Sequence, residues 1–300
     1  MSPQSVIHSS FSMKKISLKS LPLVLSALCG CTPEFDFGSI DFEPQIVVEG
    51  WIENGGVANV CLTQALTMDM DTAGTSISDI AIRWAKVTVS DGQTEEVLTG
   101  RVDKNYMPPF IYRGSRIKGE TGKTYRLKVE YSGRVLTAST TIPPVTPIEK
   151  LTVSKCTDSD TLYQIELKFH DDPLQQNYYK IFTQVIPEDT RFYPAFMGTF
   201  ADNVLEDNTG SVRANRAMRH SHIGKYTPFF SLNDTVNVKL TQLPEEGFEF
   251  WSGHENEIIN GKNPIFPSST NLSTNIQGGK GIWCGYGKVI RRVTIADSIR

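Results

Sequence analysis

The chain has 300 residues, with 30 Lys or Arg against 33 Asp or Glu, which gives a net charge of −3 at pH 7. Most basic residues stand singly, and this argues against the polycationic surface that nucleic-acid binding requires. The length is enough for a substantial core and, at an ordinary size of about 100 to 200 residues a domain, for two domains.

The start of the chain has the pattern of a bacterial lipoprotein signal peptide. Lysines precede a short apolar run, Leu21–Leu28, which is followed by Gly30 and Cys31. The run is shorter than the about 20 apolar residues of a transmembrane helix, and a small residue before the cysteine suits cleavage by a signal peptidase. We predict that residues 1–30 are removed, that the natural start is Met13, and that Cys31 carries the lipid.

Lipid attachment at Cys31 would place the protein on a membrane outside the cytoplasm. We expect the outer membrane, with the cell surface favoured over the periplasmic face; acidic Glu34 and Asp36 follow the cysteine closely but are too few to decide the leaflet. Residues 31–43 are expected to be a tether between the lipid and the first domain, because this segment is short, acidic and aromatic.

Alternation of apolar and polar residues from 44 to 143 predicts an immunoglobulin-like, antiparallel β-sandwich. In residues 125–131, apolar positions alternate with Arg, Lys and Glu, which is typical of a half-buried strand. Tyr131–Arg134 is expected to form a tight hairpin around Ser132 and Gly133. The other expected strands are residues 46–52, 58–64, 84–90 and 134–142.

Prolines at 143, 144 and 147 predict a boundary, with residues 144–147 as a linker, because proline cannot continue a central strand. Residues 148–300 are expected to form a second β-rich domain with one short helix. The helix is expected at Pro244–Ile259, since proline suits a first helical turn and apolar residues share one face. The other expectations are strands at 163–170, 177–186 and 236–240 and an irregular segment at 187–231. The predicted fold class is therefore mainly β.

The cysteines that remain beyond the signal segment are Cys61, Cys156 and Cys284. Their number and wide spacing exclude a dense disulfide scaffold. We expect three buried thiols, with one disulfide and one free thiol as the alternative, and the sequence does not assign a pairing.

Motifs that carry chemistry are incomplete in this sequence. His254-Glu255 begins like a zinc-protease helix, but Ile258 stands where the second histidine is needed. His220 and His222 lack a third metal ligand at a suitable spacing. The glycines from Gly278 to Gly287 match no phosphate-binding loop and are expected to be bends at strand ends. We therefore assign no catalytic residue, no metal and no cofactor.

Aromatic residues cluster in the segment that is expected to be irregular. Exposed aromatic side chains provide a large contact area at low entropy cost, so this cluster is the candidate binding surface, and a lid over the second core is the alternative. Its members are Phe192, Tyr193, Phe196, Tyr226, Phe229 and Phe230.

Four segments in this order, Ile46–Gly50, Ala138–Pro143, Asn177–Tyr179 and Thr274–Trp283, resemble one family. It is an outer-membrane lipoprotein family of Bacteroidota that has a domain of unknown function, number 4249, and the resemblance covers nearly all of residues 31–300. Such proteins are often encoded beside TonB-dependent receptors, so the resemblance implies a receptor of that kind as a partner.

The sequence therefore predicts a non-enzymatic outer-membrane lipoprotein that is an accessory or ligand-capture partner of a TonB-dependent receptor. Two alternatives remain: a surface or periplasmic hydrolase with an unrecognised site, and a structural protein of the envelope.

Overall fold

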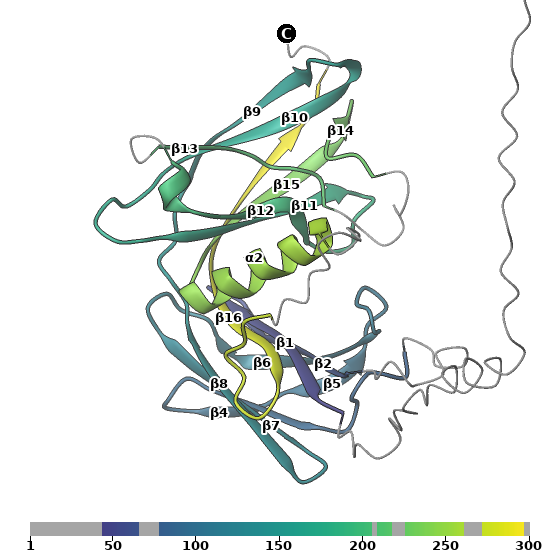
Figure 1. Cartoon of the computed structure of the whole chain (residues 1–300), viewed down its shortest axis with the longest axis vertical. Coiled ribbons are helices and arrows are strands. Elements are labelled where there is room, and N and C mark those ends of the chain that lie inside the picture. Colours follow the sequence, from purple (N-terminus) through teal and green to yellow (C-terminus); the bar gives the residue numbers. More distant parts are fainter. Residues whose placement is uncertain (1–43, 66–77, 206–208, 218–225, 261–271, 297–300) are drawn as a thin grey trace, which may run out of the picture. The chain divides into compact units, whose positions relative to one another are not determined.

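The computed structural model describes residues 44–65, 78–205, 209–217, 226–260 and 272–296. The predicted signal peptide and tether, Cys31 included, lie outside these residues. The described residues belong to one compact unit, Pro44–Arg300, which is built from three β-sheets (Figure 1). The predicted fold class, mainly β with one short helix, is confirmed.

The largest sheet has eight strands in the order β12-β11-β15-β16-β1-β2-β6-β5. All neighbours are antiparallel except β1 and β16, which run parallel. The strands are β1 (Ile46–Glu53), β2 (Val57–Gln64), β5 (Thr99–Val102), β6 (Phe110–Lys118), β11 (Tyr178–Ile186), β12 (Tyr193–Ala201), β15 (Thr235–Leu243) and β16 (Lys280–Thr294).

Two smaller sheets pack against one face of the large sheet and form two hydrophobic cores. The first sheet has the order β4-β3-β7-β8, and the second has the order β13-β10-β14 with β9 also paired to β10. Their strands are β3 (Lys86–Ser90), β4 (Glu95–Val97), β7 (Thr124–Tyr131), β8 (Arg134–Thr141), β9 (Ile148–Cys156), β10 (Ser159–His170), β13 (Thr209–Arg213) and β14 (Phe230–Ser231). We call residues 44–143 the N-terminal half and residues 148–296 the C-terminal half.

Strand β16 joins the two halves, so the expected boundary at 144–147 does not separate two self-contained domains. Residues 280–286 of β16 pair with β1 of the N-terminal half, and residues 287–294 pair with β15 of the C-terminal half (Figure 1, yellow). The N-terminal sandwich therefore needs a strand from the other end of the chain. Alternation within one strand does not show which neighbours it pairs with, so the sequence did not indicate this connection.

Gly278 and Gly279 lie in the turn before β16, as expected, whereas Gly285 and Gly287 lie inside the strand and not at its end. A Cβ atom on Gly287 would lie 2.3 Å from the carbonyl oxygen of Pro144, and one on Gly285 would lie 2.7 Å from that of Thr141. The connection between β8 and β9 thus crosses β16 at a distance that only glycine permits.

Other local predictions are confirmed. Ser132 and Gly133 have φ angles of 50° and 76° in a two-residue hairpin that pairs Tyr131 with Arg134, as the turn chemistry requires. The predicted helix is α2 (Glu245–Asn260), which starts after Pro244. Among the described residues, no helix has the length and apolar character needed to cross a bilayer.

The segment 187–231 is more regular than predicted. It contains β12, a 3₁₀ turn at Asp202–Val204, β13 and β14. The alternation in β12 is broken by a bulge, where Met197 has a left-handed φ of 52° and the register with β11 shifts. An extra residue in a strand changes which positions face the core, so the period-two pattern does not reveal the strand.

The prediction of three buried thiols is confirmed for two of them. Cys61 and Cys284 are buried and Cys156 is partly exposed, and all three are free.

Candidate functional site

The face of the large sheet opposite the two cores carries helix α2 and a set of charged side chains. We call it the outer face. The register of β11 and β15 places Lys180 beside Thr241 and Phe182 beside Lys239 on this face. Helix α2 covers part of it, with Trp251 packed against Phe182. Lysines on a sheet face are expected to reach water, so their burial here needs partners.

Lys180 is fully buried between the sheet and the helix. Its Nζ donates hydrogen bonds to Thr199 Oγ1 at 2.8 Å and to Glu255 Oε1 at 2.9 Å. It also lies 4.4 Å from the centre of the Trp251 ring, a cation–π contact. Burial lowers the pKa of Lys180, and the Glu255 carboxylate opposes this shift.

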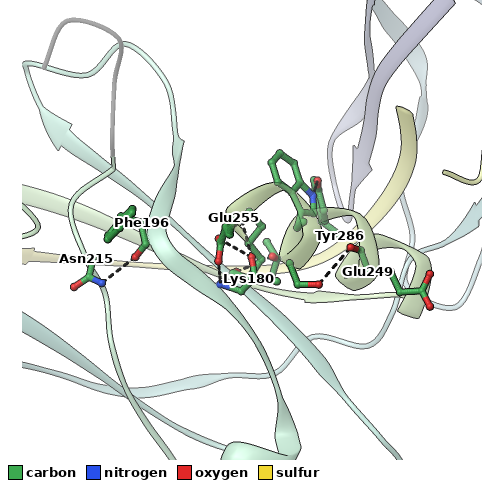
Figure 2. Close-up of polar contacts among 10 residues, drawn as sticks. Lys180, Phe196, Asn215, Glu249, Glu255 and Tyr286 are labelled. Carbon is green, nitrogen blue, oxygen red and sulfur yellow. Dashed lines mark hydrogen bonds and ion pairs between the residues drawn. The ribbon is translucent and has the colours of Figure 1, made fainter. Parts of the chain in front are cut away.

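Glu255 links α2 to β12, the strand at the edge of the sheet. Besides Lys180, it accepts a 2.7 Å hydrogen bond from Thr199 Oγ1, and its Oε2 accepts a 3.3 Å bond from Thr199 N. Figure 2 shows the Lys180 and Glu255 side chains pointing toward each other at the surface of the helix. The ion pair is well hydrogen-bonded, which is the condition for keeping such charges out of water.

A cavity of about 120 Å³ opens beside this ion pair, between α2 and the bulged part of β12. Lys180, Trp251 and Glu255 form its charged and aromatic base. Its mouth is apolar and exposed, since Met197, Ile258 and Ile259 have relative exposures of 59%, 44% and 45%. The remaining lining residues are Pro194, Ala195, Phe196 and His254.

His254 forms an uncharged wall of this cavity. Its ring lies 5.8 Å from that of Trp251 and stacks at 6.4 Å on that of Phe250. Burial lowers the pKa of His254, and the Lys180 charge lowers it further. The imidazole is therefore neutral at pH 7, and the cavity is an aromatic pocket with one ion pair at its base.

Met197 also lines a wider hollow of about 500 Å³ between β10, β12 and β13. Asn215 lies in this hollow and donates a 2.9 Å hydrogen bond to the carbonyl of Phe196 (Figure 2). Its Oδ1 atom is buried and has no partner among the described residues. The strained bulge of β12 thus separates two hollows.

A second buried charge cluster joins the halves on the outer face. Glu53 of β1 accepts hydrogen bonds from Lys239 of β15 at 2.6 Å and from Lys288 of β16 at 2.7 Å. Phe182 and Phe192 lie over the Lys239 ammonium, at 4.4 and 4.8 Å from their ring centres. Burial alone would raise the pKa of Glu53, but the two ammonium groups outweigh it and hold the pKa below its ordinary value.

The aromatic residues of the predicted binding surface do not form one exposed surface. Phe230 is fully buried in the C-terminal core, and the other five are half-buried. Phe192 covers Lys239, Tyr193 stacks on Arg191 at 4.3 Å, and Phe196 and Tyr226 meet edge to face at 5.4 Å. Of the six residues, Phe196 alone lines the cavity beneath α2. Phe230 alone of the six belongs to the C-terminal core, so neither the single binding surface nor the lid over that core describes the whole set.

The residues at the base of the cavity were not among the sequence candidates. The available signal was Lys180, a lysine inside an otherwise apolar run from Tyr179 to Phe182. Glu255 was considered only as part of an incomplete zinc-protease motif. His220 and His222 lie outside the described residues. Within the described ranges, no group of three or more His, Cys, Asp or Glu side chains is arranged to hold a metal ion.

A family model described as a domain of unknown function (DUF4249) matches residues 32–292. No curated protein matches the chain.

Proposed function

The chain belongs to the family described as domain of unknown function DUF4249, and from this premise we propose a function. The protein is a non-enzymatic lipoprotein, anchored in the outer membrane through Cys31, that assists a TonB-dependent receptor. It binds its protein partner at the cavity beneath α2, with the mouth formed by Met197, Ile258 and Ile259 as the centre of the contact.

The observation that carries this proposal is the form of the cavity. At about 120 Å³ it is well below the about 300 to 1,000 Å³ of pockets that enclose whole small molecules, and it suits one anchoring side chain. Protein interfaces concentrate their binding energy in side chains that fill such pockets, surrounded by apolar contacts that exclude water. The exposed Met197, Ile258 and Ile259 provide that surround.

The lipoprotein signal supports the cellular part of the proposal. A lipid on Cys31 would hold the protein at the membrane that contains TonB-dependent receptors. The local concentration of receptor around the protein is then high, so a contact of modest area is enough for binding. The resemblance to lipoproteins encoded beside such receptors points the same way.

The test is a pull-down from native outer membranes in mild detergent, with mass spectrometry. We expect a TonB-dependent receptor in the wild-type sample and a strong loss of it with Ile258→Asp, which places a charge at the mouth. Leu174→Asp is the matched control, because Leu174 has a relative exposure of 92% and does not line the cavity. Cys31→Ser is expected to remove the protein from the membrane fraction. Recovery of no receptor with any version would contradict the proposal.

A hydrolase is the second candidate, and one contact favours it. The Thr199 hydroxyl lies between the Lys180 ammonium and the Glu255 carboxylate, as a nucleophile would lie beside a lysine base. Thr199 does not line the cavity and its hydroxyl is bonded on both sides, so binding is preferred. Hydrolysis of p-nitrophenyl acetate that disappears in Thr199→Val and persists in Thr63→Val would reverse this preference.

A further inference from the structure

A second group of side chains on the outer face lies in the N-terminal half and is not part of the cavity beneath α2. Glu49 and Trp51 project from β1 on the same side, two residues apart and so about 7 Å from each other along the strand. Glu49 is exposed, and its carboxylate makes no hydrogen bond or ion pair with the described residues. A carboxylate that faces a sheet without a partner is available to a ligand.

Arg191 of the C-terminal half lies near enough for its charge to act on this carboxylate, and it is held in a fixed position. Its guanidinium lies between two rings, 4.6 Å from the centre of Tyr106 and 4.3 Å from that of Tyr193. Its Nε donates a 2.8 Å hydrogen bond to the carbonyl of Asn105. The terminal N–H groups make no further hydrogen bond with the described residues, so a pre-positioned set of donors is free.

Aromatic rings complete the group. The Trp51 and Tyr106 rings lie 6.1 Å apart with their planes tilted by 34°, and both are half-buried. Burial raises the pKa of Glu49, although the Arg191 charge opposes the shift. The carboxylate is thus closely surrounded by protein atoms although the residue as a whole is exposed, so a ligand can reach it from solvent.

We propose that Glu49, Trp51, Tyr106 and Arg191 form a carbohydrate-binding site. The carboxylate accepts hydrogen bonds from hydroxyl groups, the guanidinium donates to hydroxyl oxygens, and the Trp51 and Tyr106 rings contact the apolar C–H face of a sugar. Of the four residues, Glu49 is anionic and Arg191 is cationic, so their charges cancel. A neutral ligand with many donors and acceptors satisfies both groups, whereas an ion satisfies one and is repelled by the other.

The test is isothermal titration calorimetry of the full-length protein in detergent with five neutral hexasaccharides: maltohexaose, cellohexaose, mannohexaose, xylohexaose and chitohexaose. We expect at least one to bind with a Kd of about 1 mM or lower. Loss of one charge-assisted hydrogen bond weakens binding about 10-fold or more, so Glu49→Gln and Arg191→Lys should each have this effect. Both changes preserve side-chain size closely enough to keep the fold.

Matched variants separate the site from general effects. Trp51→Ala should abolish binding, and Trp84→Ala should leave it unchanged, because Trp84 has a relative exposure of 88% and lies in the bend before β3. Ile258→Asp should bind sugar normally, so this proposal and the receptor proposal fail independently. The proposal is overturned if no hexasaccharide binds at 10 mM (about ten times the expected Kd), if binding survives the Glu49, Trp51 and Arg191 substitutions, or if glycine, a zwitterion, binds in place of the sugars.

Discussion

Substitution of Glu53 by Gln should destabilise the whole described unit, because this side chain ties the two halves together. It replaces a carboxylate that accepts hydrogen bonds from Lys239 and Lys288 by a neutral amide. The side chains of Glu53, Lys239 and Lys288 have relative exposures of 16%, 8% and 24%, so water replaces little of what is lost. Two ammonium groups would then lie close together without a counter-charge.

The magnitude follows from the loss of one buried partner. Removing one member of a buried ion pair costs about 3 to 5 kcal/mol, since the charge left behind is uncompensated. Most of this cost comes from Lys239, which is the more buried of the two lysines, because the Lys288 ammonium group is partly exposed to water. We expect about 3 kcal/mol and, at about 2 to 4 °C for each kcal/mol in a unit of this size, a fall in Tm of about 10 °C.

The pH dependence provides a second readout. The pKa of Glu53 is lower in the folded protein than in the unfolded chain. Its contribution to stability is therefore present above the unfolded pKa of about 4.3 and is lost as pH falls through the folded value. The difference in Tm between wild type and Glu53→Gln should be full at pH 7 and should shrink steadily below pH 4.

The assay is differential scanning calorimetry at pH 7 and at several values below pH 5. Glu95→Gln is the control, because the Glu95 side chain is exposed and makes no hydrogen bond with the described residues. A Glu53→Gln protein that melts within about 2 °C of wild type at pH 7 would refute the reasoning. It would mean that the two lysines find water or other partners when the carboxylate is removed.

Three further predictions concern the fold. Glu96→Gln should lower the free energy of unfolding by about 2 kcal/mol at pH 7, and urea titrations test this. Burial would raise the pKa of Glu96, but the backbone N–H groups of Ile117, Ser115 and Arg116 donate to its carboxylate and hold the pKa low, so the difference from wild type should disappear below about pH 4. Gly287→Ala should lower Tm, since its Cβ would lie 2.3 Å from the carbonyl oxygen of Pro144. With iodoacetamide at pH 8, Cys156 should react first, because burial raises the pKa of Cys61 to about 12 and also raises the pKa of Cys284. Mass spectrometry that finds Cys61 or Cys284 alkylated first would contradict this.

The local features of the fold were predictable because they depend on short-range chemistry. The hairpin at Ser132 and Gly133 follows from the left-handed φ angles that those residues tolerate. The alternation of buried and exposed residues in β7 follows from one sheet face being buried. The start of α2 follows from Pro244. In each case the residues that decide the structure lie within a few positions of it.

The pairing of β16 was not predictable in this way. Its partners, β1 and β15, are strands from opposite ends of the described chain. The glycines that allow the crossing, Gly285 and Gly287, were visible in the sequence. Their contacts with the carbonyls of Thr141 and Pro144 were not, because those contacts exist only after both halves have folded around one sheet.

The same argument explains why the sequence predicted a binding surface from the clustered aromatic residues and did not indicate Lys180. Clustered Phe and Tyr residues indicate a binding surface only if the segment is truly irregular, because residues in a strand can instead be packed against the protein. The bulge at Met197 conceals β12 from the period-two pattern, so the residues around it were assigned to a loop. Lys180, by contrast, stands in a strand whose apolar neighbours require it to be buried, and a buried lysine requires a carboxylate. A charged residue within a predicted core strand is thus a better indicator of a site than an aromatic cluster in a predicted loop, since the charge must have a partner and the partner must come from another element.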